Sequence, residues 1–356
     1  MKPYFSIVIP YHNSQATIGK LLESLAQSKR APSFEVIVAD DGSDEAFVRS
    51  PGRIRGKQYD LQSVRFATNR GPAAARNAGA ARARGQYLIF MDSDVEVFPD
   101  TLYQIAKIFT TDPDVVALAG VWTKSQRSKA FFPNFKALRD WSYWINEREA
   151  GAYYYIFSTR IAAIKEAVFR RLGGFDESYK AALVEDIELT YRIARRYAVL
   201  FEPRVRVRHE FEGFWRVAVK YFWRSYHWVL LYQDRKKFDL VATTSKEAAA
   251  AVSAVILVGL VPLRLLSYVT LPHAFLCYFI PVFDINVCFG SLLQGLLLAT
   301  TILHLYFVRK FLRFVAREKG IGFAIRSFFV GIALYCFITA GALWAKIPIS
   351  RKLPHW

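Results

Sequence analysis

The sequence has few of the residues that would indicate a disulfide-bonded or metal-finger protein. Its 356 residues include only three cysteines, and these have no C-x-x-C spacing. Because Cys277, Cys288 and Cys336 all lie in the apolar C-terminal part, we interpret them as apolar residues of a lipid region. A G-x-G-x-x-G fingerprint is also absent, which argues against a dinucleotide-dependent dehydrogenase. No signal peptide is predicted, because the apolar run Phe5–Ile9 is short and meets Pro10.

Acidic residues are scarce relative to basic ones. The chain has 30 Asp and Glu against 48 Lys and Arg, which gives a formal net charge of +18 at pH 7. Such a balance indicates a polyanionic partner: nucleic acid, an anionic membrane face or a phosphate-bearing substrate. No recognised nucleic-acid-binding motif accompanies the charge, whereas long apolar runs do. We therefore expect the chain to associate with a membrane and not to bind nucleic acid.

The first two hundred residues alternate short apolar runs with amphipathic ones. Strands are predicted at Phe5–Ile9, Phe34–Ala39, Val64–Ala67 and Tyr87–Met91, and helices at Thr17–Ser28 and from Pro72 to Gly85. This β-α-β-α order predicts an α/β fold with a mostly parallel sheet, helices on both faces and ligands outside the carboxyl ends of the strands.

The chain becomes strongly apolar from Ala248 onward. Runs long enough to cross a hydrocarbon core of about 30 Å are Ala248–Val269, Ile285–Val308 and Gly322–Ala345. The first of these requires Arg264 to extend toward the nearer interface. The intervening segment Leu271–Asp284 carries two prolines, and could be a hairpin loop, a re-entrant segment or part of a fourth span.

Basic residues between the apolar runs predict the membrane topology. The clusters Arg235-Lys236-Lys237 and Arg309-Lys310 are typical of cytoplasmic loops. An even number of crossings must therefore separate them, and two is the natural number. We expect a multi-pass protein of the cell membrane with a cytosolic N-terminal domain, and three spans would leave the C-terminus outside.

The segment Glu210–Tyr232 is dense in aromatic residues and cations. Arg216, Lys220 and Arg224 recur along one helical flank, which is typical of a helix lying in the membrane interface. A core helix of the first domain is the alternative. We therefore divide the chain into an α/β domain at residues 1–209, an interfacial helix and linker at 210–246, and a C-terminal α-helical transmembrane domain at 247–356.

Acidic residues directly follow two of the predicted strands. Asp92 and Asp94 come after Tyr87–Met91, and the period of two puts both on one side of the chain. Carboxylates at the carboxyl end of a sheet can hold a hard divalent cation that also binds a diphosphate; a solvated turn is the alternative. Asp40 and Asp41 follow the second strand and could accept hydrogen bonds from a base or a ribose.

Four motifs follow one another in the first hundred residues: Ser6-Ile7-Val8-Ile9-Pro10-Tyr11-His12-Asn13, Asp40-Asp41-Gly42-Ser43, Asn69-Arg70-Gly71 through Ala75-Arg76-Asn77-Ala78-Gly79, and Asp92-Ser93-Asp94. In this order they resemble the motifs of glycosyltransferase family 2, which has the Rossmann-like GT-A fold and inverts configuration at the transferred sugar. The resemblance resumes at Gly173-Gly174-Phe175-Asp176-Glu177 and Glu185-Asp186, so it covers most of the first 210 residues. No single motif is specific, but their combination in this order is.

The resemblance implies roles for the matching residues. Those implied to bind the sugar-nucleotide donor are Pro10, Tyr11, Asp40, Asp41, Arg76, Asn77 and Asp92. The first two would line the nucleobase pocket together with Asp40. Asp92 would bind the ribose or the water shell of a metal ion, and Asp94 would bind the Mg²⁺ or Mn²⁺ ion directly. His209, at the end of a strand-like run, would complete the metal shell or be an ordinary buried or surface histidine.

The resemblance makes Asp186 the general base. An inverting transfer needs one, because the acceptor hydroxyl must lose its proton as it attacks the anomeric carbon, and a positioned carboxylate contributes roughly 10²–10⁴-fold. A phosphate acceptor is already ionised, and Asp186 would then orient it. The alternative is an acidic residue that only stabilises a helix N-terminus.

The combined pattern predicts metal-dependent, inverting transfer of one sugar from a nucleoside-diphosphate sugar to a membrane-embedded acceptor. A UDP-sugar is favoured as donor, and a polyprenyl phosphate or a lipid-linked glycan as acceptor. The Q-x-x-R-W motif of processive synthases is absent, and Tyr221-Phe222-Trp223-Arg224 only partly resembles it. A processive polysaccharide synthase is the nearest alternative. A catalytically inactive scaffold that binds nucleotide sugar is an alternative of another class.

Overall fold

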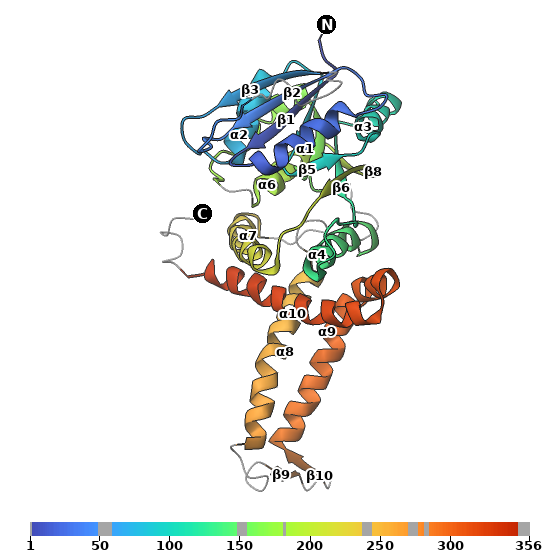
Figure 1. The fold of residues 1–356 in the computed structure, drawn as a ribbon. Coiled ribbons are helices and arrows are strands. Elements are labelled where there is room, and N and C mark those ends of the chain that lie inside the picture. Colours follow the sequence, from blue (N-terminus) through green and yellow to red (C-terminus); the bar gives the residue numbers. More distant parts are fainter. Residues whose placement is uncertain are drawn as a thin grey trace. The chain divides into compact units, whose positions relative to one another are not determined.

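The computed structural model describes residues 2–48, 59–147, 155–180, 183–236, 244–269, 277–280 and 285–347. These residues form two compact units, one holding the described residues up to Phe214 and the other those from Trp215 onward (Figure 1).

An eight-stranded sheet is the centre of the first unit, with the strand order β3-β2-β1-β4-β7-β6-β8-β5. The strands are β1 (Phe5–Tyr11), β2 (Phe34–Asp40), β3 (Asp60–Arg65), β4 (Tyr87–Met91), β5 (Val95–Val97), β6 (Ala117–Trp122), β7 (Ile161–Lys165) and β8 (Val199–His209). The strands β3, β2, β1 and β4 are mutually parallel, and β7 pairs antiparallel with β4. The predicted α/β fold with a mostly parallel sheet is confirmed.

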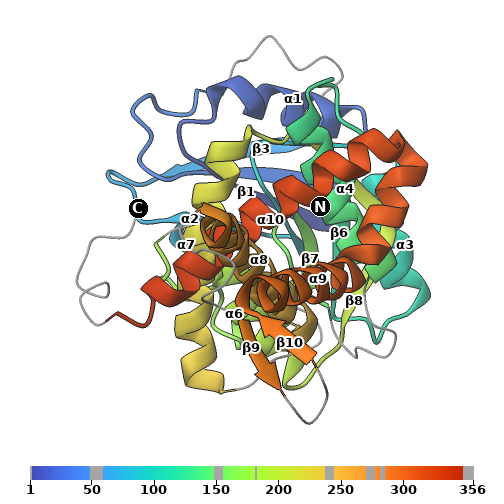
Figure 2. The ribbon, with the colours of Figure 1, turned by 90° about the horizontal axis from the view of Figure 1, so that it is seen from below.

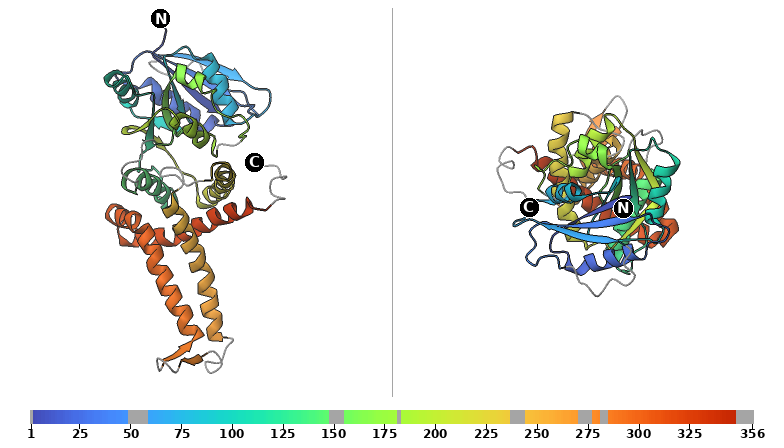
Figure 3. Two further views of the ribbon diagram at one scale, coloured as in Figure 1. Left: turned by 180° about the vertical axis from the view of Figure 1, so that it is seen from behind. Right: turned by 90° about the horizontal axis from the view of Figure 1, so that it is seen from above.

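Helices cover both faces of this sheet because its strands are apolar on both sides. The helices are α1 (Gln15–Ala26), α2 (Pro72–Arg82), α3 (Thr101–Thr111), α4 (Phe131–Ser142), the π-helix η1 (Tyr143–Glu147), α5 (Glu166–Arg171) and α6 (Glu185–Ala194). Alternate residues of β1 belong to different cores: Ile7 packs with α1 and α3, and Val8 with α2, α5 and α6 (Figure 1; from behind in Figure 3).

The largest differences between the predicted and observed bounds in this unit concern β3 and α2. The third strand is Asp60–Arg65 rather than Val64–Ala67, because its ladder with β2 starts at Glu35↔Asp60. It is an edge strand with exposed polar side chains, so hydropathy conceals its first residues. The helix that was expected to stop at Gly85 ends at Arg82.

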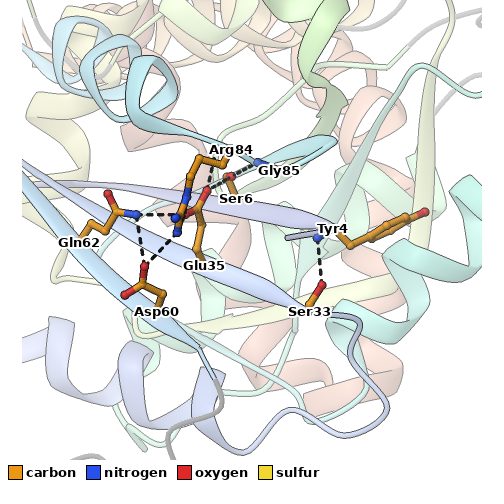
Figure 4. Close-up of polar contacts among 8 residues, drawn as sticks. All are labelled: Tyr4, Ser6, Ser33, Glu35, Asp60, Gln62, Arg84 and Gly85. Atoms are coloured by element: carbon orange, nitrogen blue, oxygen red, sulfur yellow. Dashed lines mark hydrogen bonds and ion pairs between the residues drawn. The ribbon is translucent and has the colours of Figure 1, made fainter. Parts of the chain in front are cut away.

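A buried carboxylate at the amino ends of the strands ties this edge of the sheet together (Figure 4). The Glu35 carboxylate is 1% exposed and accepts hydrogen bonds from Ser6 Oγ at 2.6 Å and from Arg84 Nη2 at 2.6 Å. Gly85 donates its N–H to the same Ser6 hydroxyl, and a Cβ there would lie 2.5 Å from the Ser6 nitrogen. The network is structural, and it lies at the opposite end of the strands from the acidic motifs.

The second unit is mainly helical. Its elements are α7 (Phe214–Arg235), α8 (Ser245–Val269), β9 (Cys277–Ile280), β10 (Ile285–Cys288), α9 (Phe289–Lys319) and α10 (Ile321–Trp344). The helices α8, α9 and α10 are long and apolar enough to cross a membrane, as predicted.

The second predicted span begins later than expected. Ile285–Cys288 is a strand that pairs antiparallel with Cys277–Ile280, because both segments form a β-ladder before the helix starts at Phe289. The rest of Leu271–Asp284, whose course the sequence left open, lies outside the described residues.

Candidate active site

The acidic motifs meet at the carboxyl ends of the central parallel strands. In the register of β1 with β2, Tyr11 lies opposite Asp40, and β4 on the other side of β1 leads directly into Asp92. Parallel strands end at one edge of the sheet, so motifs about 30 and 50 residues apart come together there. Pro10 is half-buried and Tyr11 is buried against Phe47 at this edge.

Asp94 and His209 form a side-chain pair that the sheet register creates. Antiparallel pairing of β5 with β8 puts Val95 opposite His209, so the residue before Val95 faces the end of β8. His209 Nε2 lies 3.1 Å from Asp94 Oδ2. The other ring nitrogen, Nδ1, is buried without a hydrogen-bond partner, beside the rings of Trp122 and Phe211.

Arg76 bridges two carboxylates beneath the site. Its guanidinium is 2% exposed and donates to Asp92 Oδ1 at 2.9 Å and to Glu185 Oε1 at 2.8 Å. Burial acts to lower the pKa of Arg76, but Glu185 and Asp92 outweigh it and raise that pKa. The side chain therefore joins α2, the end of β4 and the start of α6 through an ion triad in which Arg76 and Glu185 are buried and Asp92 is partly buried.

The two carboxylates of the D-x-D motif have different surroundings. Desolvation raises the pKa of Asp92 to about 6, against the opposing effect of Arg76 and with a further contribution from nearby Asp94. The Asp94 side chain is about half exposed, at 48%. The Asp92 side chain, at 32% exposed, is thus more enclosed by the protein than that of Asp94.

Asp186 lies in the first turn of α6, directly after Glu185. It is half-buried and close enough to Arg76 to contribute to the raised pKa of that arginine. The predicted base therefore lies beside the ion triad that also contains Asp92 of the D-x-D motif. Its catalytic role stays a prediction.

Asp40 and Asp41 are buried and hold loops in place. Asp40 Oδ1 accepts from the N–H of Ser43 and Oδ2 from that of Phe47, each at 2.9 Å. Burial acts to raise the pKa of Asp40, but these N–H groups outweigh it and lower the pKa. Asp41 accepts from the N–H of Arg70 at 2.7 Å and from that of Gly71 at 2.9 Å. Whether either residue also contacts a nucleotide stays a prediction.

Asn77 fixes the glycine-rich motif that follows α5. Its Oδ1 accepts from the N–H of Phe175 at 2.9 Å, and its Nδ2 donates to the Phe175 carbonyl at 2.9 Å and to Glu177 Oε1 at 3.1 Å. Gly174 has φ +73°, and a Cβ there would lie 2.6 Å from Asn77 Oδ1. This contact explains the glycine, and it gives Asn77 a structural partner that the sequence did not indicate.

The residues present fit a divalent cation that is shared with a diphosphate. Among the described residues, no three His, Cys, Asp or Glu side chains converge as a complete metal site. Mg²⁺, however, is typically held by one or two carboxylates together with substrate phosphates and water, so a full protein cage is not required. Asp94 and His209 supply an exposed oxygen and a ring nitrogen at one place, which suits such a partial site.

The comparisons with known proteins agree with this geometry. The model of glycosyl transferase family 2 matches residues 6–172. A pre-mycofactocin glycosyltransferase of Mycobacterium tuberculosis is 30% identical over 211 residues, which cover 58% of this chain and 42% of that protein. An uncharacterised glycosyltransferase of Haemophilus influenzae is 33% identical over 110 residues, 31% of this chain and 36% of that protein. Residues 6–172 therefore resemble a family 2 glycosyltransferase domain, and the matches span less than half the length of these relatives.

A solved structure shows the same fold. It is a mannosyltransferase of Pyrobaculum calidifontis in complex with GDP-Man and Mn²⁺, with a TM-score of 0.53, 18% identity, and coverage of 98% of this chain and 89% of that chain. At this identity the likeness concerns the fold alone, and it confirms GT-A architecture.

Sequence reasoning missed two acidic residues that hold the site. The sequence pattern shows Glu185 only as the neighbour of Asp186, and Glu177 only as part of a motif. Glu185 is buried against Arg76, and Glu177 pairs with Arg70 at 3.0 Å as well as with Asn77. The only available signal was their position within matching motifs, because their partners lie about 100 residues away in the chain.

Proposed function

We propose that this chain transfers a glycosyl group from a nucleoside-diphosphate sugar to an acceptor held in the membrane. The observation that carries the proposal is the convergence of the D-x-D motif, His209 and the Glu185-Asp186 pair at the carboxyl edge of a family 2 sheet. The apolar helices of the second unit support a membrane-borne acceptor, such as a polyprenyl phosphate or a lipid-linked glycan.

In this proposal the donor diphosphate binds at Asp94 and His209 together with a divalent cation. The cation would supply charge neutralisation for the leaving diphosphate. The related mannosyltransferase structure contains Mn²⁺ and a nucleotide sugar, which supports this assignment. Arg76 binds Asp92 and Glu185, so the backbone next to them, which carries Asp94 and Asp186, is held in place.

Asp186 would accept the proton of an acceptor hydroxyl as that oxygen attacks the anomeric carbon. The new glycosidic bond forms while the bond to the diphosphate breaks, which inverts configuration. Where the acceptor is a phosphate, the attacking oxygen is already anionic and Asp186 would orient it.

The metal assignment is tested on the purified full chain with a panel of nucleoside-diphosphate sugars and Mg²⁺ or Mn²⁺. Asp94→Asn should abolish transfer without unfolding the protein, because the loss of a carboxylate ligand weakens the diphosphate site. Asp114→Asn, the same chemical change at an exposed residue outside the site, should leave activity intact. Full activity of Asp94→Asn, or of the parent in excess chelator, would contradict the metal role.

The base assignment has a separate kinetic test. Asp186→Asn should lower turnover by at least about 10²-fold with little change in donor affinity, because the role of a base is realised in the transition state. Donor affinity is measured by calorimetry or fluorescence. A variant that cannot bind donor would remove Asp186 from this role. If the parent binds donor but transfers no sugar to any acceptor and hydrolyses none, the scaffold alternative is favoured.

A further inference from the structure

The helix α10 runs across the α8–α9 pair instead of alongside it. Figure 1 shows this crossing, and Figure 2, which looks along α8 and α9, shows α10 from its side. The contacts agree. Tyr335 of α10 donates to Glu247 Oε2 at 3.0 Å, and its ring lies 5.8 Å from that of His304. Glu247 is in the first turn of α8.

The level of this crossing marks the edge of the apolar part of both helices. On α8, α10 packs on Ala250, Ala251 and Ala254, just after the polar start of the helix. On α9, its neighbours include Phe307 and Val308, which directly precede the basic residues from Arg309 onward. A membrane-spanning helix passes from hydrocarbon to headgroups where apolar residues give way to basic ones. The middle of α10 therefore lies at the interface level.

The C-terminal end of α10 lies against α7, which precedes α8 in the chain. Ala342, Trp344 and Ala345 pack with residues of α7. A Cβ on Gly341 would lie 2.0 Å from the Phe222 carbonyl oxygen, so the two helices cross in backbone contact. Because α7 is joined to the start of α8, the C-terminal end of α10 is on the side where α8 begins.

Basic residues flank α10 at both ends, which indicates that both ends lie on the same side of the membrane. Arg317 and Lys319 precede the helix, and Lys346, Arg351 and Lys352 follow it. Lysine and arginine accumulate on the cytosolic side of membrane segments, and a spanning helix normally carries the excess at one end only. Basic flanks at both ends fit a helix whose two ends share one side.

The outer surface of α10 is mainly apolar, with one exposed cation, Arg326, near its start among the described residues. Ile321, Ile325, Phe329 and Leu343 have relative exposures of 74%, 55%, 64% and 57% within the protein. Since α7, α8 and α9 occupy other sides of the helix, these side chains need an apolar surrounding. Acyl chains near the headgroup boundary supply one, and this is the depth at which interfacial helices bury their apolar faces.

We propose that α10 does not cross the membrane, but lies in the leaflet where α8 begins, with this apolar surface in the acyl chains. The chain then crosses the bilayer twice, through α8 and α9, and both ends of α10 are on the side where α8 begins. This differs from the three crossings that length and hydropathy predict, and it does not depend on the proposed enzymatic function.

Single cysteines test the topology in the full chain. In a background with Cys277→Ser, Cys288→Ser and Cys336→Ser, the reporters are Lys346→Cys after α10, Lys319→Cys before it, and Asp284→Cys between α8 and α9. Intact cells are treated with a membrane-impermeant maleimide, before and after permeabilisation. Asp284→Cys should react in intact cells, whereas Lys319→Cys and Lys346→Cys should react only after permeabilisation. Reaction of Lys346→Cys together with Asp284→Cys in intact cells would overturn the proposal.

A depth measurement gives an independent reading. Nitroxide labels at Ile325, Phe329, Ala340 and Leu343 are compared for collision with oxygen and with a water-soluble nickel chelate in lipid vesicles. A helix lying in the leaflet should give similar depths at the four positions. Depths that pass through a maximum along the helix would instead show a crossing, even if Lys346→Cys were unreactive in both conditions.

Discussion

At the scale of single residues, the ion pairs of the buried Arg76 fix the side chains of the candidate site. Arg76 pairs with two carboxylates that differ in burial. The Glu185 side chain is buried, at 3% exposed, whereas the Asp92 side chain is 32% exposed and still reached by water. A buried ion pair adds little stability relative to an apolar pair, but removal of one partner leaves an uncompensated charge. The two carboxylates should therefore respond differently to the loss of Arg76.

We predict that Arg76→Met destabilises the protein by about 3–5 kcal/mol, mainly because Glu185 is left charged in the interior. The double variant Arg76→Met/Glu185→Gln should recover part of this loss, since a neutral amide needs no counter-charge. Thermal unfolding of the full chain in detergent measures both. Arg204→Met, which removes a surface pair with Glu202, is the control and should leave the unfolding temperature nearly unchanged, because exposed ion pairs add little stability. A double variant no more stable than Arg76→Met would contradict this account.

Motifs identified many of these residues, but they did not identify their contacts. Asp41, Arg76 and Asn77 were expected to face the donor, and the structure shows each bonded to protein groups. Their partners lie between 16 and 109 residues away. A hydrogen bond over such a separation follows from the fold, which the local pattern does not contain.

At the scale of elements, the apolar pattern was informative where a strand or helix is buried. Tyr87–Met91, buried along its whole length, has the predicted bounds. The polar edge strand β3 was misplaced, and the short strand Ile285–Cys288 was included in a helix, because apolar runs do not distinguish the two. Hydropathy also does not predict the orientation of α10, because that orientation depends on the contacts of the helix with α7, α8 and α9.

The crossing of α7 and α10 gives a prediction at this scale. Gly341→Val should force the helices apart, because its Cβ would lie 2.0 Å from the Phe222 oxygen and 2.8 Å from the carbonyl carbon. Gly331→Val adds the same β-branched side chain to the same helix, where a Cβ meets nothing within 4 Å. We expect a lower thermal unfolding temperature in detergent and faster proteolysis for Gly341→Val only. Equal behaviour of the two variants would show that the close contact has no energetic importance.

At the scale of the whole molecule, the excess of positive charge is concentrated where the second unit would meet a membrane. The exposed residues Arg216, Lys220 and Arg224 recur every four residues along α7, and further cations follow the apolar part of α9. A lipid acceptor with a phosphate would be attracted to such a surface, whereas water as acceptor would not. A change of charge on α7 should therefore alter the binding of a lipid acceptor without altering the chemical step.

The corresponding variant is Arg216→Glu/Lys220→Glu/Arg224→Glu. Each cation near an anionic surface is worth about 1 kcal/mol, so the loss of three should weaken engagement of a lipid acceptor by roughly 10²-fold. Hydrolysis of the donor by water should change little. Transfer to polyprenyl phosphate in vesicles and donor hydrolysis are measured on the same preparation.

The matched control is Lys29→Glu/Arg82→Glu/Lys107→Glu, which makes the same change in net charge at exposed residues of the first unit. It should affect neither reaction. If the α7 variant lost both reactions equally, the segment would act only through the fold. Efficient transfer by the parent to a soluble acceptor, with none to a polyprenyl phosphate or a lipid-linked glycan, would refute the lipid acceptor, because the cations on α7 would then have no substrate phosphate to attract.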